Sequence, residues 1–204
     1  MIAPTFRGQS DFEIKKAEDL AALGYLGFAI DLYGQGRRAA TPEMAAMLMN
    51  ELNHNRPLLR ARFLAILKEI KNHTLADPEK VGAIGFCFGG KCVLDLARTG
   101  TNIKGVVSFH GIYDAPDHLE NTPIKSKVLV LHGWEDPLAP PDSLVRLGHE
   151  LTRKKADWQI LAFGHTGHAF TNPNAKDHDG GMFFQSQSND RARSKMIEFF
   201  QEVF

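Results

Sequence analysis

The stretch Val81-Gly82-Ala83-Ile84-Gly85-Phe86-Cys87-Phe88-Gly89-Gly90 decides the fold of this chain. It starts as a short apolar strand, ends in Gly-x-Cys-x-Gly, and continues as an apolar-periodic helix from about Lys91 to Arg98. A sharp turn from strand to helix needs small neighbours, because its central residue is strained and its side chain must stand clear of the backbone. The pattern is that of a nucleophile elbow with cysteine in place of the commoner serine. It predicts that Cys87 is a nucleophile at the end of a strand.

Both cysteines of the chain lie in this region. The helix behind Cys87 directs free N–H groups and partial positive charge at the sulfur, which in general stabilises a thiolate. The alternative is a buried structural thiol, since free cysteine is among the most buried residue types. Cys92 falls on the interior side of the helix and is expected in the core. The spacing matches neither C-x-x-C nor a zinc pattern, and it suits reduced thiols in the cytoplasm.

Length and composition limit the class of protein. A chain of 204 residues without internal repeats or linkers fits one domain, over 1–204. The 24 basic and 24 acidic residues cancel, so no broad basic surface for nucleic acid is expected. No window approaches the roughly 18 apolar residues of a membrane span, and the start has no pattern of a signal peptide. We therefore expect a cytoplasmic protein with neither nucleic acid nor membrane as a partner.

Apolar strands alternate with amphipathic helices along the chain. A capping box, Ser10-Asp11-Phe12-Glu13, begins the first helix, and Gly24 ends it. Further strands are predicted at 27–30, 105–109, 128–131 and 158–161, and further helices after Thr41-Pro42, from about Leu58, over 143–151 and around 196–203. Such alternation predicts a mostly parallel sheet covered on both faces, a three-layer α/β/α sandwich. The polar stretch 171–190 is predicted to be a long surface loop.

Three chemically active residue types follow three of these strands. Cys87 ends one, Asp136 follows the second in His-Gly-Trp-Glu-Asp, and His168 follows the last in His-Thr-Gly-His. The carboxyl ends of parallel strands meet at one edge of a sheet, so these groups are expected together. The order nucleophile, acid, histidine is that of α/β-hydrolases. In such a triad the imidazole takes the thiol proton, the carboxylate orients the imidazole, and the thiolate attacks.

Each assignment has a rival. His165 stands in the same loop as His168, and Glu135 stands beside Asp136. Asp136 could also merely cap the segment that follows it, because Asp before Pro137 is a turn signal. Three groups of side chains also allow more than one interpretation. A metal site could be formed by His165, His168, Asp177, His178 and Asp179, although their spacing matches no zinc pattern. Arg37 and Arg38 could form a solvated turn or an anion clamp, and the core or a pocket wall could contain Phe183, Phe184, Phe199 and Phe200.

The chain resembles the dienelactone hydrolase family of the α/β-hydrolase fold over nearly its whole length. The resemblance is carried by Leu23-Gly24-Tyr25, Asp31-Leu32-Tyr33-Gly34, the Gly85–Gly90 elbow, Phe109-His110-Gly111, His132-Gly133-x-x-Asp136 and Gly167-His168-Ala169-Phe170. It implies Cys87 as nucleophile, His168 as base and Asp136 as its orienting acid, without cofactor or metal. It also implies an oxyanion hole from the backbone N–H groups of Phe6 and Phe88.

The chain departs from the family pattern at three places. Thr5 stands where dienelactone hydrolases carry a glutamate that contacts the resting cysteine. Gln35 and Asn172 stand where they carry arginines that grip the substrate carboxylate. Only the tail of a central strand precedes Thr5, so the fold is expected to be shortened at its N-terminus, unless other strands or a partner chain close the gap.

These patterns predict a hydrolase that cleaves a small ester or lactone through a Cys-His-Asp triad and an acyl-enzyme. The substrate follows less closely from the resemblance than the triad does, because the arginine positions differ. The alternative is a catalytically silent protein of the same fold that binds a ligand or senses oxidants through Cys87. The sequence leaves the oligomeric state open.

Overall fold

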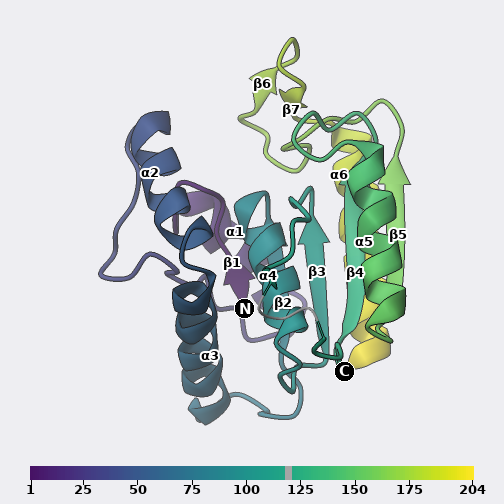
Figure 1. The fold of residues 1–204 in the computed structure, drawn as a ribbon. Helices are drawn as coiled ribbons and strands as arrows, with labels where there is room; N and C mark the ends of the chain where they lie inside the picture. Colours follow the sequence, from purple (N-terminus) through teal and green to yellow (C-terminus); the bar gives the residue numbers. More distant parts are fainter. Residues whose placement is uncertain (118–120) are drawn as a thin grey trace.

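Five parallel strands form the central sheet of this protein in the order β1-β2-β3-β4-β5 (Figure 1). The structure is a computed structural model that describes residues 1–117 and 121–204. The strands are β1 (Ile2–Ala3), β2 (Gly82–Phe86), β3 (Gly105–Phe109), β4 (Lys127–Gly133) and β5 (Asp157–Phe163). Every residue of β2 and β3 is buried, as continuously apolar strands covered on both faces require. The parallel sheet predicted from the sequence is confirmed.

Helices cover both faces of the sheet (Figure 1). On one face lie α2 (Pro42–Asn53), α3 (Arg56–Asn72), α4 (Phe88–Arg98) and α5 (Pro141–Arg153), and on the other lie α1 (Asp11–Ala21) and α6 (Ser186–Val203). The buried apolar side chains accordingly form two clusters, one on each side of the sheet. The Ser10 capping box begins α1 as predicted, with both of its reciprocal hydrogen bonds present. The three-layer α/β/α sandwich predicted from the alternation of strands and helices is confirmed.

The segment 27–30 is not a full strand. Ala29 forms a single parallel bridge with Ile2, and the Ile2 N–H donates to Phe28 O at 2.7 Å. The other edge of β1 pairs with Ile84 and Gly85 of β2. Because β1 has only two residues, the apolar segment beside it has too few backbone partners to extend its pairing.

The prediction of a long loop over 171–190 is wrong in part. This stretch contains a small antiparallel hairpin, β6 (Lys176–Asp177) with β7 (Met182–Phe183), and the first turn of α6. The turn between the strands is closed by the Gly180 N–H, which donates to Asp177 Oδ1 at 2.8 Å. Two-residue strands show no alternation of polar and apolar residues, so the polar composition concealed the hairpin.

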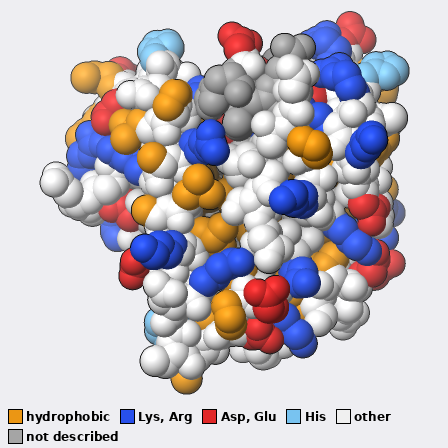
Figure 2. Space-filling model, turned by 60° about the horizontal axis from the view of Figure 1, so that its bottom comes forward, with side chains coloured by type: hydrophobic (Ala, Val, Ile, Leu, Met, Phe, Trp, Pro, Cys, Tyr) orange, Lys and Arg blue, Asp and Glu red, His pale blue; other side chains and the backbone are white. Residues whose placement is uncertain are grey.

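The surface at the amino ends of the strands is mixed in charge. Figure 2 shows Lys and Arg side chains spread over this face with acidic and neutral side chains between them. This distribution agrees with the formal net charge of zero. Among the described residues, the longest helices are too polar or too short to cross a membrane.

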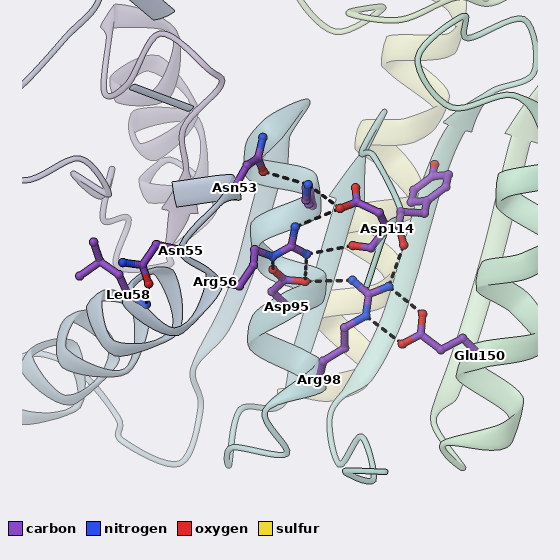
Figure 3. Close-up of polar contacts among 10 residues, drawn as sticks. Asn53, Asn55, Arg56, Leu58, Asp95, Arg98, Asp114 and Glu150 are labelled. Carbon is purple, nitrogen blue, oxygen red and sulfur yellow. Dashed lines mark hydrogen bonds and ion pairs between the residues drawn. The ribbon is translucent and has the colours of Figure 1, made fainter. Parts of the chain in front are cut away.

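A buried network of ion pairs holds α4 in place on the sheet (Figure 3). Arg98, at 1% exposure, donates to both carboxylate oxygens of Glu150 on α5 at 2.9 and 2.7 Å, and to Asp95 at 3.0 Å. Arg56, which begins α3, donates to Asp95 and to Asp114 at 2.9 and 3.0 Å. The network therefore links α3, α4 and α5 to the segment that follows β3.

We expect Arg98→Met to lower the free energy of unfolding by about 3–5 kcal/mol, because it leaves buried carboxylates without their cation. Urea unfolding followed by circular dichroism measures the change. Lys127→Met is the control, since Lys127 pairs with Glu202 on the exposed surface and should matter far less. Equal losses in the two variants would contradict a stabilising role for the buried network.

Candidate active site

Cys87 occupies the turn between β2 and α4 in a strained backbone conformation. Its φ of 56° and ψ of −117° lie where residues other than glycine are rarely found. A Cβ atom on Gly85 would lie 2.0 Å from the Gly89 carbonyl oxygen, and one on Gly89 would lie 2.3 Å from that of Ala3. The glycines of Gly-x-Cys-x-Gly are therefore needed for the close approach of three backbone segments. The elbow predicted from the sequence is present.

His168 and Asp136 form a buried pair near this turn. The His168 Nδ1–H donates to Asp136 Oδ2 at 2.8 Å, and both side chains are almost wholly buried. The other carboxylate oxygen, Asp136 Oδ1, accepts from the N–H groups of Leu138 and Ala139 at 2.8 and 3.3 Å. Asp136 thus both caps the turn after Pro137 and binds the imidazole. The cap fixes the carboxylate in the orientation that the histidine needs.

The hairpin β6–β7 holds the backbone of His168. The His168 N–H donates to Gly181 O at 2.7 Å, and the Phe183 N–H donates to His168 O at 3.1 Å. In Figure 1 the hairpin lies beyond the carboxyl ends of the sheet strands. The segment that the sequence pattern predicts as a surface loop is therefore what positions the histidine.

The charge of His168 follows from its surroundings. Burial alone would lower its pKa, but the negative charge of a Cys87 thiolate and the hydrogen bond to Asp136 outweigh burial and raise the pKa to about 10. At neutral pH the ring therefore carries a proton on each nitrogen. The buried Nε2 has no partner of full hydrogen-bond geometry, and the sulfur of Cys87 is the group with which it interacts. The imidazole of His168 thus lies between the carboxylate of Asp136 and the sulfur of Cys87.

The segment with Phe6 is fixed by polar contacts on both sides. Its carbonyl oxygen accepts from Tyr33 Oη at 2.8 Å, and the Thr5 N–H donates to Glu13 Oε1 at 2.9 Å. Glu13 is fully buried and also accepts from the Ser10 N–H at 2.9 Å. In the described chain the N–H groups of Phe6 and Phe88 donate to no protein acceptor.

The alternative candidates His165 and Glu135 lie on the surface and not beside Cys87. The side chain of His165 is 97% exposed, and its Nδ1 lies 3.2 Å from Glu135 Oε1 on the surface. Cys92 is fully buried, and burial raises the pKa of its thiol well above the usual value. Cys92 is therefore a core residue, as predicted. The described residues contain no group of His, Cys, Asp and Glu side chains arranged to hold a metal ion.

The two arginines near the site have structural partners. Arg37 donates to both carboxylate oxygens of Glu51 on α2 at 2.9 and 3.1 Å, and Arg38 donates to Gln9 Oε1 at 3.0 Å. Asn172 accepts from the Asn174 N–H at 3.0 Å. These contacts favour the interpretation that both arginines stabilise a turn.

Sequence reasoning missed two polar residues of the site. His110 Nδ1 accepts from the Cys87 N–H at 3.1 Å, and its Nε2 lies 2.8 Å from Thr171 Oγ1. The motif Phe109-His110-Gly111 was the available signal, but nothing in it indicated which strand end the imidazole would contact. Glu13 was found only as part of a capping box.

Comparisons with known proteins find similar sequences and similar folds. The family model described as "Dienelactone hydrolase family" matches residues 1–204. A solved structure described as m3DLH is 34% identical, with a TM-score of 0.92 over 100% of this chain and 85% of its own. A dienelactone hydrolase-like promiscuous phosphotriesterase from metagenomic libraries is 32% identical, with the same TM-score and coverage. The human carboxymethylenebutenolidase homolog is 28% identical over 66% of this chain and 53% of its own length.

Proposed function

This chain belongs to the dienelactone hydrolase family, and on that premise we propose that it hydrolyses a small ester or lactone with Cys87 as the nucleophile. The observation that carries the proposal is the buried 2.8 Å hydrogen bond between His168 and Asp136 beside the Cys87 elbow. His168 and Asp136 are the general acid–base and its orienting carboxylate. The N–H groups of Phe6 and Phe88 form the oxyanion hole.

In the first half-reaction the thiolate of Cys87 attacks the carbonyl carbon of the ester. The electron pair of the C=O bond moves to oxygen, and the N–H groups of Phe6 and Phe88 stabilise the negative charge. The tetrahedral intermediate then collapses, the bond to the leaving oxygen breaks, and His168 Nε2 gives its proton to that oxygen. The products are an alcohol, or the opened end of a lactone, and a thioester on Cys87.

In the second half-reaction His168 is neutral and acts as a base. Its Nε2 takes a proton from water while the water oxygen attacks the thioester carbon. Collapse of the second tetrahedral intermediate breaks the carbon–sulfur bond and releases the carboxylic acid. Cys87 leaves as the thiolate, and His168 retains the proton, so the resting ion pair is restored.

We expect Asp136→Asn to lower kcat by about 10⁴-fold on a chromogenic short-chain ester, because an amide in this place permits the wrong imidazole tautomer. Steady-state kinetics measures the loss. Glu135→Gln is the matched control, because the carboxylate of Glu135 is next in sequence to Asp136 but lies on the surface beside His165. Near-wild-type turnover by Asp136→Asn would contradict the assigned triad.

The substrate class follows from what lies at the family's arginine positions. Gln35 and Asn172 replace the two arginines, and the nearby Arg37 and Arg38 are held by Glu51 and Gln9. An anionic substrate would meet an amide instead of a cation at positions 35 and 172, and the Arg37 guanidinium is already paired with Glu51. The proposed substrate is therefore uncharged: a neutral ester or lactone, with a neutral phosphotriester as a further candidate because a relative 32% identical is described as a phosphotriesterase.

We expect kcat/KM to be at least about tenfold higher for a neutral ester than for its carboxylate-bearing analogue, because a carboxylate would be desolvated without a partner. A matched pair of chromogenic esters measures this ratio. Asn172→Arg should narrow it by restoring a cation. A preference of the wild type for the anionic ester would contradict the proposed substrate class.

A further inference from the structure

A second buried imidazole, that of His110, lies beside the proposed triad. His110 follows the last residue of β3, and its own N–H donates to Leu131 O of β4 at 2.8 Å. Its φ of 37° is in the left-handed region, which is uncommon for a residue with a side chain. The side chain is 2% exposed. A strained and buried histidine at the carboxyl end of a strand calls for a physical explanation.

The hydrogen bonds of His110 fix its tautomer. Nδ1 accepts at 3.1 Å from the backbone N–H of Cys87, which is shared with Phe109 O at 3.1 Å, so Nδ1 carries no proton. The proton of the neutral ring is therefore on Nε2, which donates to Thr171 Oγ1 at 2.8 Å. Both ring nitrogens are used by these two contacts. His110 consequently has no free nitrogen with which to act as a base on substrate.

Two imidazoles in contact thus carry different charges. The rings of His110 and His168 have centroids 5.0 Å apart and meet edge to face at 66°. Burial and the positive charge of His168 hold the pKa of His110 well below its usual value. His110 remains neutral while His168 is protonated, which is the pattern of a site that divides roles between titratable groups.

The two contacts of His110 connect separate parts of the site. Cys87 is in the turn between β2 and α4, whereas Thr171 stands three residues after His168 in the segment that follows β5. Thr171 is itself 2% exposed. Two hydrogen bonds of the His110 imidazole therefore connect the backbone N–H of Cys87 to Thr171, in the segment that also contains His168.

We propose that His110 is a positioning residue that, through Thr171, sets the distance between the nucleophile Cys87 and the general base His168. The expected change in kcat rests on the proposed function, whereas the tautomer and the hydrogen bonds of His110 do not. The alternative is that His110 only fills space against Phe170, whose ring centroid lies 5.1 Å away.

The kinetic test removes one hydroxyl. Thr171→Val keeps the shape of the side chain and deletes the acceptor for His110, so kcat on a neutral chromogenic ester should fall by about 10- to 100-fold while KM changes little. Thr171→Ser restores the hydroxyl and should restore most of kcat. Wild-type kcat in Thr171→Val, or an equal loss in Thr171→Ser, would overturn the inference.

Two further variants separate the halves of the bridge. His110→Asn, a residue that tolerates positive φ, keeps an acceptor for the Cys87 N–H but cannot reach Thr171. His110→Gln keeps a donor near the Nε2 position but loses the acceptor for the Cys87 N–H. Both should lose kcat if the whole bridge is required, and retention of full kcat in either would overturn the inference.

A spectroscopic readout separates this inference from the proposed function. In ¹⁵N NMR spectra of the protein without substrate, His110 should show one protonated nitrogen, Nε2, at neutral pH. A doubly protonated ring or a proton on Nδ1 would overturn the inference even if the enzyme is active. Absence of ester turnover in the wild type, with the expected spectrum, would overturn only the proposed function.

Discussion

Cys87→Ala should reduce turnover of a chromogenic short-chain ester by about 10⁶-fold, the loss found when the nucleophile of a comparable hydrolase is removed. The reason is that no second nucleophile lies at the elbow. Cys92, the other thiol, is fully buried on α4 and cannot meet a substrate. Steady-state kinetics measures kcat of the variant and of the wild type.

Cys92→Ala is the matched control for this prediction. It removes the second thiol, which lies within α4, and should cost stability through the cavity that it leaves while kcat is retained. Substantial ester turnover by Cys87→Ala would exclude the covalent mechanism. In that case peroxide oxidation of Cys87 to a sulfenic acid, without ester turnover in the wild type, would favour a redox-sensing protein.

His168→Ala should cause a loss of the same order, about 10⁶-fold, because the thiolate then loses the cation that stabilises it and the leaving group loses its proton donor. His165→Ala is the control, since that imidazole lies in the same loop but is 97% exposed. The same chromogenic ester measures both variants. Comparable losses in the two would contradict the choice of His168.

The raised pKa of His168 gives this prediction a second readout, in stability. The native state holds a proton on the ring up to about pH 10, whereas the unfolded chain releases it near the ordinary value of about 6.5. The proton therefore stabilises the fold fully below the lower value, and this contribution is lost as pH rises through about 10. The stability advantage of wild type over His168→Ala should shrink across that range, as urea unfolding would show. A constant difference would contradict the ion pair.

Much of the fold could be predicted because its signals are local. The apolar runs of β2 and β3 and the capping box of α1 are each contained in a few consecutive residues, and the structure has them where they were expected. The segment 27–30 and the hairpin β6–β7 could not be predicted in the same way. Segment 27–30 forms only a single bridge with Ile2 although its apolar run predicts a strand, and β6 and β7 have two residues each, too few to show a periodic pattern.

The same difference applies to the site. The placement of Cys87, Asp136 and His168 at one edge of the sheet could be predicted, because each follows a strand whose carboxyl end must reach that edge. The contact of His110 with Cys87 could not be predicted, since it depends on a left-handed turn that brings the imidazole to the backbone of Cys87. The contact of Glu13 with Thr5 likewise depends on how the first helix packs.

The most direct test of the central claim is to find the acyl group. The wild-type protein is mixed with an excess of a chromogenic acetate ester, quenched in acid within the first turnovers, digested and analysed by mass spectrometry. We expect one acetyl group on the peptide that contains Cys87, and none on that peptide in Cys87→Ala. Ester turnover by the wild type without an adduct on Cys87, or with the adduct on another residue, would contradict it.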